Sequence, residues 1–153
     1  MALRDEIQQT KPFTSLQEEA LLNIVRTSAA MMDEMEELLK ERGITNTQYN
    51  VLRILRGAEP DGLCRNELRD RMLTRMPDVT RLLDRMEQAG LVARSRDNED
   101  RRLVSTRITP AGRRVVDELD APVRSFHKTR LAHMSDDQMR TLVELLTLMR
   151  GRG

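Results

Sequence analysis

Aromatic residues are scarce in this chain of 153 residues, which has no tryptophan, one tyrosine and two phenylalanines. Its apolar residues are mostly leucine, methionine, valine and alanine, which favour helices over a β-sandwich. No run of about 18 apolar residues occurs, so we expect no transmembrane helix and no membrane partner. The start, MALRDEIQQT, lacks the apolar core of a secretory signal. We therefore expect a cytoplasmic, mainly helical protein.

Cysteine is also scarce. The lone Cys64 excludes an internal disulfide framework and agrees with a reducing compartment. Its place at a predicted helix start raises the alternative of a redox sensor, but a small capping or half-buried residue is the favoured interpretation. His127 and His133 have no third ligand at useful spacing, which favours surface or interface positions over a zinc site. Without a Ser-His-Asp arrangement or a glycine-rich phosphate loop, we predict no enzyme, no cofactor and no metal.

Lysine is missing from the middle of the chain, where the positive charge is carried by arginine alone. Residues 65–114 hold 13 arginines against 8 Asp and Glu. The flanks differ, since residues 1–64 hold 7 basic against 11 acidic residues and residues 115–153 hold 6 of each. A basic middle between acidic or neutral flanks indicates a polyanion as partner of the middle segment. A GC-rich genome, which also favours arginine, is an alternative contribution.

Hydrophobic periodicity changes twice within the same middle segment. A helical face is formed at spacings i, i+3, i+4 and i+7 by Val79, Leu82, Leu83 and Met86. Gly90 can take a positive φ and end this helix. Alternation then predicts two strands, in Leu91–Arg96 and Val104–Ile108, joined by a polar turn over 97–102. A helix followed by a hairpin with arginines at its tip is the outline of a winged helix.

The remaining segments predict further helices around this winged unit. After an extended arm over residues 1–15, apolar stripes and caps place helices over Leu16 to about Glu41, from the Thr45 capping box to near Gly57, from Cys64 over Leu68 and Met72, from Thr109-Pro110 to about Leu131, and from the Ser135 capping box to Met149. We expect Pro122 to kink or interrupt its helix near Asp120. The predicted fold is therefore mainly α, with about six helices and a small β-hairpin wing.

The terminal helices carry more apolar surface than a lone winged domain can cover. The broad Leu16–Leu39 face, Phe126 and the Met139–Met149 stripe make up this surface, which predicts a dimer. We assign residues 45–115 to a winged helix-turn-helix lobe. Residues 1–44 and 116–153 form the helical dimerisation region, with contacts expected at Leu16, Phe126, Met139, Leu142, Val143, Leu146 and Met149.

The second helix of a helix-turn-helix presents its N-terminal residues to base edges in the major groove. We place the start of that helix near Met76, with Asp78, Arg81 and Arg85 opposite its buried face. Arginine can bind guanine bidentately, and threonine can contact phosphate or a thymine methyl group. The alternative is a solvated face joined by Asp78–Arg81 and Arg81–Asp84 pairs. The hairpin favours DNA binding, because arginine inserts readily into a narrow minor groove and the wing carries Arg94, Arg96, Arg101 and Arg102.

The combination of motifs resembles the multiple-antibiotic-resistance regulators, the MarR family. The matching segments, which span about residues 16–150, are Thr45-x-x-Gln48-Tyr49-x-Val51-Leu52, residues 78–87 (DVTRLLDRME), Gly90-Leu91-Val92, Asp100-Arg101-Arg102 and Ile108-Thr109-Pro110-Ala111-Gly112. The resemblance implies a homodimer of winged helix-turn-helix protomers on a pseudo-palindromic operator. It also implies that the Asp100-x-Arg102 pattern places Arg102 in the minor groove, and that contacts from the recognition helix lie within Arg75–Arg85.

These arguments together give one set of predicted DNA contacts. It comprises Arg75, Pro77, Asp78, Thr80, Arg81, Arg85, Arg96, Asp100, Arg101 and Arg102. The function expected from the resemblance is a repressor that a small aromatic or phenolic effector releases from double-stranded DNA by changing the spacing of the recognition helices. Met31, Met35 and Tyr49 could line the effector pocket, although methionines at helical spacing are more often plain core. The alternative function is a winged-helix module that binds protein and not DNA.

Overall fold

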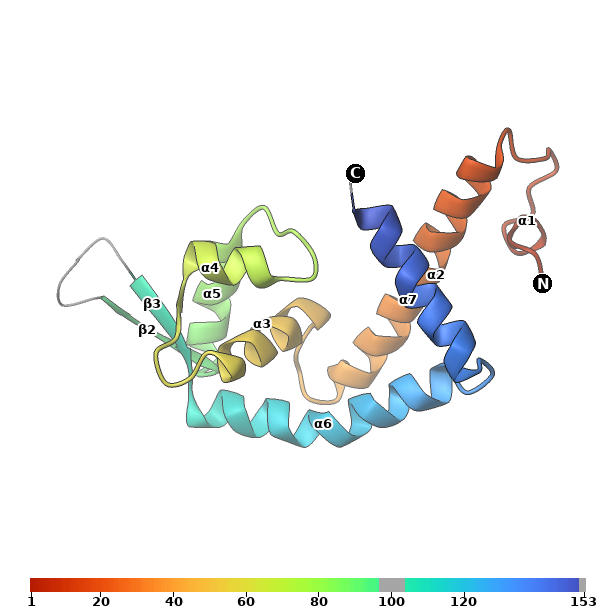
Figure 1. The fold of residues 1–153 in the computed structure, drawn as a ribbon. Coiled ribbons are helices and arrows are strands. Elements are labelled where there is room, and N and C mark those ends of the chain that lie inside the picture. The colour runs from red at the N-terminus through yellow and green to blue at the C-terminus, as the bar shows by residue number, and fades with distance from the viewer. Residues whose placement is uncertain (97–103, 152–153) are drawn as a thin grey trace. The chain divides into compact units, whose positions relative to one another are not determined.

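The computed structural model describes residues 1–96 and 104–151, and the chain divides into two compact units, Met1–Val116 and Asp117–Gly153 (Figure 1). The helices are α1 (Leu3–Glu6), α2 (Leu16–Lys40), α3 (Asn46–Gly57), α4 (Arg65–Arg71), α5 (Val79–Gln88), α6 (Pro110–Arg130) and α7 (Asp136–Arg150). The strands are β1 (Leu63–Cys64), β2 (Val92–Arg96) and β3 (Val104–Ile108). The predicted class, mainly helical with a small β wing, is confirmed.

Both predicted capping boxes are present at helix starts. The Thr45 hydroxyl accepts the Gln48 amide at 3.2 Å, and the Gln48 side chain accepts the Thr45 amide at 3.1 Å. Ser135 and Gln138 make the same reciprocal pair at 3.2 and 2.9 Å. Each pair satisfies two amide groups that a helix start otherwise leaves without partners. The sequence therefore sets where α3 and α7 begin.

The core of the first unit lies among α3, α4, α5 and the sheet, which Figure 1 shows grouped together. The fully buried side chains of α3, α4, α5 and β2 in this core are Val51, Leu52, Leu55, Leu68, Met86 and Val92. Burying each large apolar side chain contributes about 1.5–3 kcal/mol relative to exposure. This packing fixes α5 against α4 and against the base of the hairpin.

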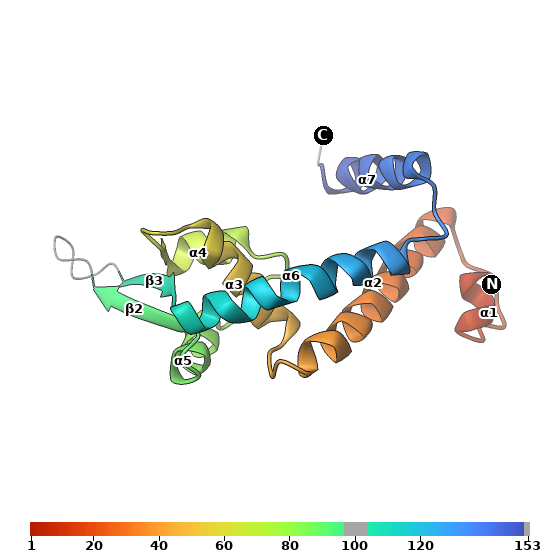
Figure 2. The same cartoon turned by 90° about the horizontal axis from the view of Figure 1, so that it is seen from below.

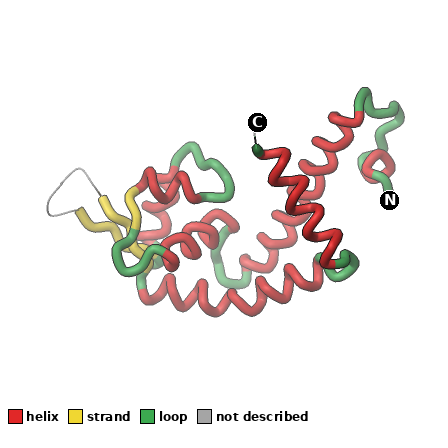
Figure 3. Tube along the Cα trace, viewed as in Figure 1, coloured by secondary structure: helices red, strands yellow, loops and turns green. Residues whose placement is uncertain are grey.

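The sheet has three antiparallel strands in the order β1-β3-β2. The predicted hairpin is confirmed, since β2 and β3 run side by side as antiparallel strands (Figures 2 and 3). In their register Val92 lies opposite Ile108 and Arg96 opposite Val104. The third strand was not predicted, because two residues are too few to display alternation. It forms where Leu63 pairs with Thr106. The predicted turn over 97–102 lies outside the described residues.

Three sequence predictions differ from the structure. Residues 1–15 are not wholly extended, because Leu3–Glu6 forms a single helical turn. The side chain of Arg4 closes this turn by donating to the carbonyl oxygens of Gln9 and Thr10. The predicted interruption near Asp120 is absent, because α6 runs continuously through Pro122, while a kink at that proline stays a prediction. Proline removes one amide donor from the ladder, which a helix of 21 residues tolerates.

The third difference concerns α5, which begins at Val79 and not near Met76. Asp78 takes the N-cap position, because a short carboxylate can accept a free amide at a helix start. Pro77 therefore precedes the cap and lies outside the first turn. Separately, no helix within residues 1–96 and 104–151 is long and apolar enough to cross a membrane.

Candidate nucleic-acid interface

The helix α5 is fixed at both ends by local hydrogen bonds. At its start the Asp78 carboxylate accepts the Arg81 amide at 2.9 Å. At its end the Leu91 amide donates to Met86 and the Gly90 amide donates to Glu87, each at 2.9 Å, with Gly90 at φ 74°. This pair of bonds is the Schellman motif, and the positive φ explains the glycine. Hydrogen bonds therefore define both the first and the last residue of α5.

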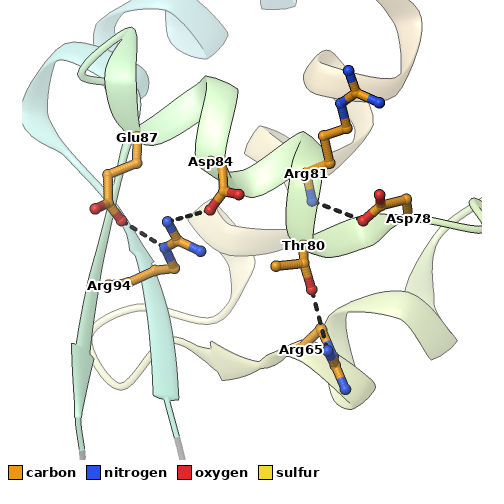
Figure 4. A network of polar contacts seen from close by, with 7 residues as sticks. All are labelled: Arg65, Asp78, Thr80, Arg81, Asp84, Glu87 and Arg94. Atoms are coloured by element: carbon orange, nitrogen blue, oxygen red, sulfur yellow. Dashed lines mark hydrogen bonds and ion pairs between the residues drawn. The ribbon is translucent and has the colours of Figure 1, made fainter.

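The two faces of α5 are chemically opposite. Its buried residues are Val79, Leu82, Leu83 and Met86, as the periodicity predicted. Thr80, Arg81 and Arg85 are exposed on the remaining surface. Figure 4 shows the Arg81 side chain extending away from the neighbouring polar contacts. The exposed face of α5 thus offers cationic and hydroxyl groups to a partner.

Arg65 adds a cation that sequence reasoning missed. It is the first residue of α4, and its guanidinium Nη1 donates to the Thr80 hydroxyl at 3.1 Å (Figure 4). This contact joins residues 15 apart in the sequence, on two helices. The missed signal was the position directly after the predicted cap at Cys64, which puts Arg65 at the N-terminal end of α4.

Arg94 is a residue of β2, and its side chain contacts two carboxylates of α5. Its Nη2 is 2.6 Å from Asp84 Oδ1, and its Nε is 2.7 Å from Glu87 Oε2 (Figure 4). Hydrogen bonds that the guanidinium donates to Glu87 and, with a smaller effect, to Asp84 raise the pKa of Arg94 above its ordinary value. We predicted Arg94 only as one cation among several on the wing. Its pairing with Asp84 replaces the Arg81–Asp84 pair considered as an alternative.

A cleft of about 310 Å³ opens between α4, α5 and the sheet. Its lining residues are Cys64, Arg65, Asn66, Thr80, Leu83, Arg94, Val104 and Thr106. A second cleft, of about 670 Å³, is lined by Arg69, Asp70, Met72, Arg75, Met76 and Pro77 beside the turn between α4 and α5. Both clefts adjoin the exposed start of α5.

The predicted DNA contacts that fall on described residues are all exposed, namely Arg75, Pro77, Asp78, Thr80, Arg81, Arg85 and Arg96. The other three, Asp100, Arg101 and Arg102, lie outside the described residues. Besides Arg65 and Arg94, further arginines of the basic segment have intramolecular partners, since Arg107 donates to the Asp61 carbonyl at 3.1 Å and Arg113 pairs with Glu59. The positive charge of residues 65–114 is therefore shared between the surface and internal contacts.

The residues predicted for dimerisation are mostly exposed. Along α7, which has no buried residue, Val143 is 63% and Met149 50% exposed, and on α2 Leu16 is 77% exposed. Phe126, Met139 and Leu146 are half-buried, and Leu142 is 39% exposed. Of the predicted effector-pocket residues, Met31 and Met35 lie one turn apart and half-buried on α2, and Tyr49 is buried on α3.

Comparison with known proteins gives consistent relatives. The sequence matches the MarR family over residues 44–104. A MarR transcription factor from Planctomyces limnophilus is 38% identical, with a TM-score of 0.68, over 90% of this chain and 99% of that one. MepR of S. aureus, solved in complex with DNA, is 26% identical with a TM-score of 0.76, over 90% and 97% of the two chains.

A transcriptional regulator matches this sequence at the same identity as MepR. The HTH-type transcriptional regulator FarR of Neisseria gonorrhoeae is 26% identical over 82% of this chain and 84% of its own length. Two observations support the same family. The helices α3, α4 and α5 and the hairpin form a winged arrangement, and the Planctomyces protein is matched over 99% of its length. The chain belongs to the MarR family of transcriptional regulators.

Proposed function

We propose that this regulator is a homodimeric repressor that binds a pseudo-palindromic operator in double-stranded DNA. In this proposal α5 lies in the major groove, where Arg81, Arg85 and Thr80 contact bases and phosphates. The wing carries Arg96, Asp100, Arg101 and Arg102 to the adjacent minor groove. Residues 45–115 form the DNA-binding lobe, and residues 1–44 and 116–153 form the dimerisation region.

The observation that carries this proposal is the two-sided character of α5. One side is buried through Leu82, Leu83 and Met86, so the helix cannot rotate without exposing core. The other side keeps Arg81 and Arg85 exposed. A helix entering the major groove requires this rigid orientation and a cationic outer face. The MepR relative, which was solved with DNA, supports the same use.

The dimer and its effector complete the proposal. The exposed apolar residues of α7 support self-association, because a contiguous apolar face of this kind marks an interaction surface. Two-fold symmetry would place the two recognition helices about 34 Å apart, one turn of DNA. A small aromatic or phenolic effector, bound near Met31, Met35 and Tyr49, would favour a dimer whose helix spacing no longer fits the operator.

The test is selection of duplexes from a random pool by the purified full chain, together with the DNA upstream of its own gene. We expect one enriched palindromic motif whose affinity falls steeply with salt, because each released counterion adds to the slope. Arg85→Ala and Arg102→Ala should each weaken binding by about 1–3 kcal/mol. The control Arg140→Ala, an exposed arginine on α7 paired with Asp137, should bind normally.

Failure to enrich any motif, or an affinity independent of salt, would overturn the proposal. It would favour a winged-helix module that binds protein. Equal losses in Arg85→Ala, Arg102→Ala and Arg140→Ala would also contradict it, because they would indicate general attraction of DNA to positive charge.

A further inference from the structure

Arg94 occupies the point where the hairpin leaves the core. Strand residues alternate between faces, so Val92, Arg94 and Arg96 share one face of β2. Val92 is buried, Arg94 is half-buried and Arg96 is exposed. Arg94 is therefore the last residue of this face that still contacts the helical core, before the strand continues to the wing.

The partners of Arg94 lie one turn apart on α5. Asp84 and Glu87 are related as i and i+3, which puts both carboxylates on the side of the helix that faces β2. They engage two different nitrogens of the guanidinium, Nη2 and Nε (Figure 4). Two contacts from separate side chains fix the plane of the group as well as its position. The result is a rigid link between β2 and α5.

The carboxylates of Asp84 and Glu87 would by themselves weaken DNA binding. Both are on the proposed recognition helix and partly exposed, at 49% for Asp84 and 42% for Glu87. Negative charge there repels phosphates. Partly exposed ion pairs also contribute little to stability, typically below about 1 kcal/mol. A geometric task accounts for the cluster better than either DNA affinity or stability does.

We propose that Arg94 is a positioning residue, which together with Asp84 and Glu87 fixes the direction in which the β2–β3 hairpin leaves α5. The link sets the angle between helix and wing, so that both meet DNA at the same time. Arg94 itself does not contact DNA. This inference rests on the proposed function, because it concerns how that site is aligned.

The direction in which DNA affinity changes on removal of Asp84 and Glu87 distinguishes the positioning role from simple charge repulsion. The double variant Asp84→Ala/Glu87→Ala removes two negative charges from α5, so charge alone predicts tighter DNA binding. The proposed link predicts about tenfold weaker binding, within the range for loss of a groove contact. The matched control is Asp70→Ala on α4, whose carboxylate contacts only the adjacent Arg69 among the contacts described. It should bind as tightly as the native protein, or more tightly.

Arg94→Met should weaken binding to the same degree as the double variant. Combining all three substitutions should add little further loss, because they break one link. The melting temperature of each variant reports folding, and Glu87→Ala alone replaces the double variant if that protein does not fold. Double-variant binding equal to or tighter than native would overturn the inference, as would additive losses in the triple variant.

A second readout distinguishes this failure from failure of the proposed function. Residual dipolar couplings of the β2 and β3 amides, measured against those of α5 in the protein without DNA, report the direction of the hairpin. We expect them to change in the double variant and to stay unchanged in Asp70→Ala. If the native protein binds no duplex, the proposed function fails, and these couplings still test the link. Unchanged couplings in the double variant would contradict the proposal that Arg94, Asp84 and Glu87 fix the direction of the hairpin.

Discussion

Gly112 stands where the first turn of α6 passes closest to the end of α5. Thr109 caps this turn, because its hydroxyl accepts the Gly112 amide at 3.0 Å and donates to the Gly90 carbonyl at 2.6 Å. A Cβ added at Gly112 would collide with the backbone carbonyl oxygen of Leu91. The glycine is therefore required by close approach of two backbone segments, and not by an unusual φ.

We expect Gly112→Ala to lower the free energy of unfolding by about 1–3 kcal/mol, the cost typical of forcing atoms into a packed site. Urea denaturation measures it. Gly57→Ala is the matched control, because Gly57 is also helical and has nothing within 4 Å of an added Cβ. That control should be neutral or slightly stabilising. Equal effects of the two substitutions would contradict the steric argument.

Cys64 shows how a poor capping residue is compensated by its neighbour. Its amide donates to Glu67 Oε2 at 2.8 Å, which is the reciprocal half of a capping box. This amide bond, followed by a contribution from the Cys64 thiol, lowers the pKa of the Glu67 carboxyl. A lowered folded-state pKa means that the carboxylate supports α4 above its unfolded pKa, and that this support is lost as the pH falls through the folded value.

At the scale of elements, two substitutions at the start of α5 can distinguish a capping role of Asp78 from a direct contact of its carboxylate with DNA. Asp78→Ala removes the cap and should cost about 1 kcal/mol of stability and weaken DNA binding. Asp78→Asn keeps an oxygen that can accept the Arg81 amide, so stability and DNA affinity should both be retained. Thermal unfolding and duplex titration measure the two effects. DNA binding as weak in Asp78→Asn as in Asp78→Ala would instead support a direct contact by the carboxylate.

Elements with a strong period or cap were predictable from the sequence, and contacts distant in sequence were not. The stripe from Val79 to Met86 and the capping box at Thr45 are local signals, and both helices are present, although α5 begins at Val79 and not near Met76. The strand β1 was missed because its two residues form a strand only by pairing with β3. The Arg94 link was missed for the same reason, since nothing local indicates which acidic residues a strand arginine will contact.

At the scale of the whole molecule, net charge is a poor guide to how many arginines contact DNA. The segment 65–114 has an excess of positive charge, yet Arg94 contacts two carboxylates and Arg113 pairs with Glu59. These arginines fasten the strand β2 and the start of α6. The exposed arginines Arg81 and Arg85 remain on the outer face of α5. A basic segment thus supplies both the internal contacts of the lobe and its proposed DNA surface.

The proposed dimer makes a prediction for α7. Val143 lies on its apolar stripe and is 63% exposed in the single chain, so a partner would bury it. Val143→Asp would place an unpaired carboxylate in that interface, at a cost of several kcal/mol. We therefore expect the dissociation constant of the dimer to rise by about a hundredfold or more. Sedimentation equilibrium measures this change.

Thr141→Asp supplies the matched control, because it also replaces a β-branched, exposed residue of α7 by aspartate, on the side of the helix away from Val143. It should remain dimeric. Operator affinity should fall in Val143→Asp alone, since a monomer contacts one half-site and loses the gain from binding two linked sites at once. An unchanged dimer in Val143→Asp would exclude this stripe as the interface. A monomer that still binds the full operator with native affinity would show that dimerisation is not needed for recognition.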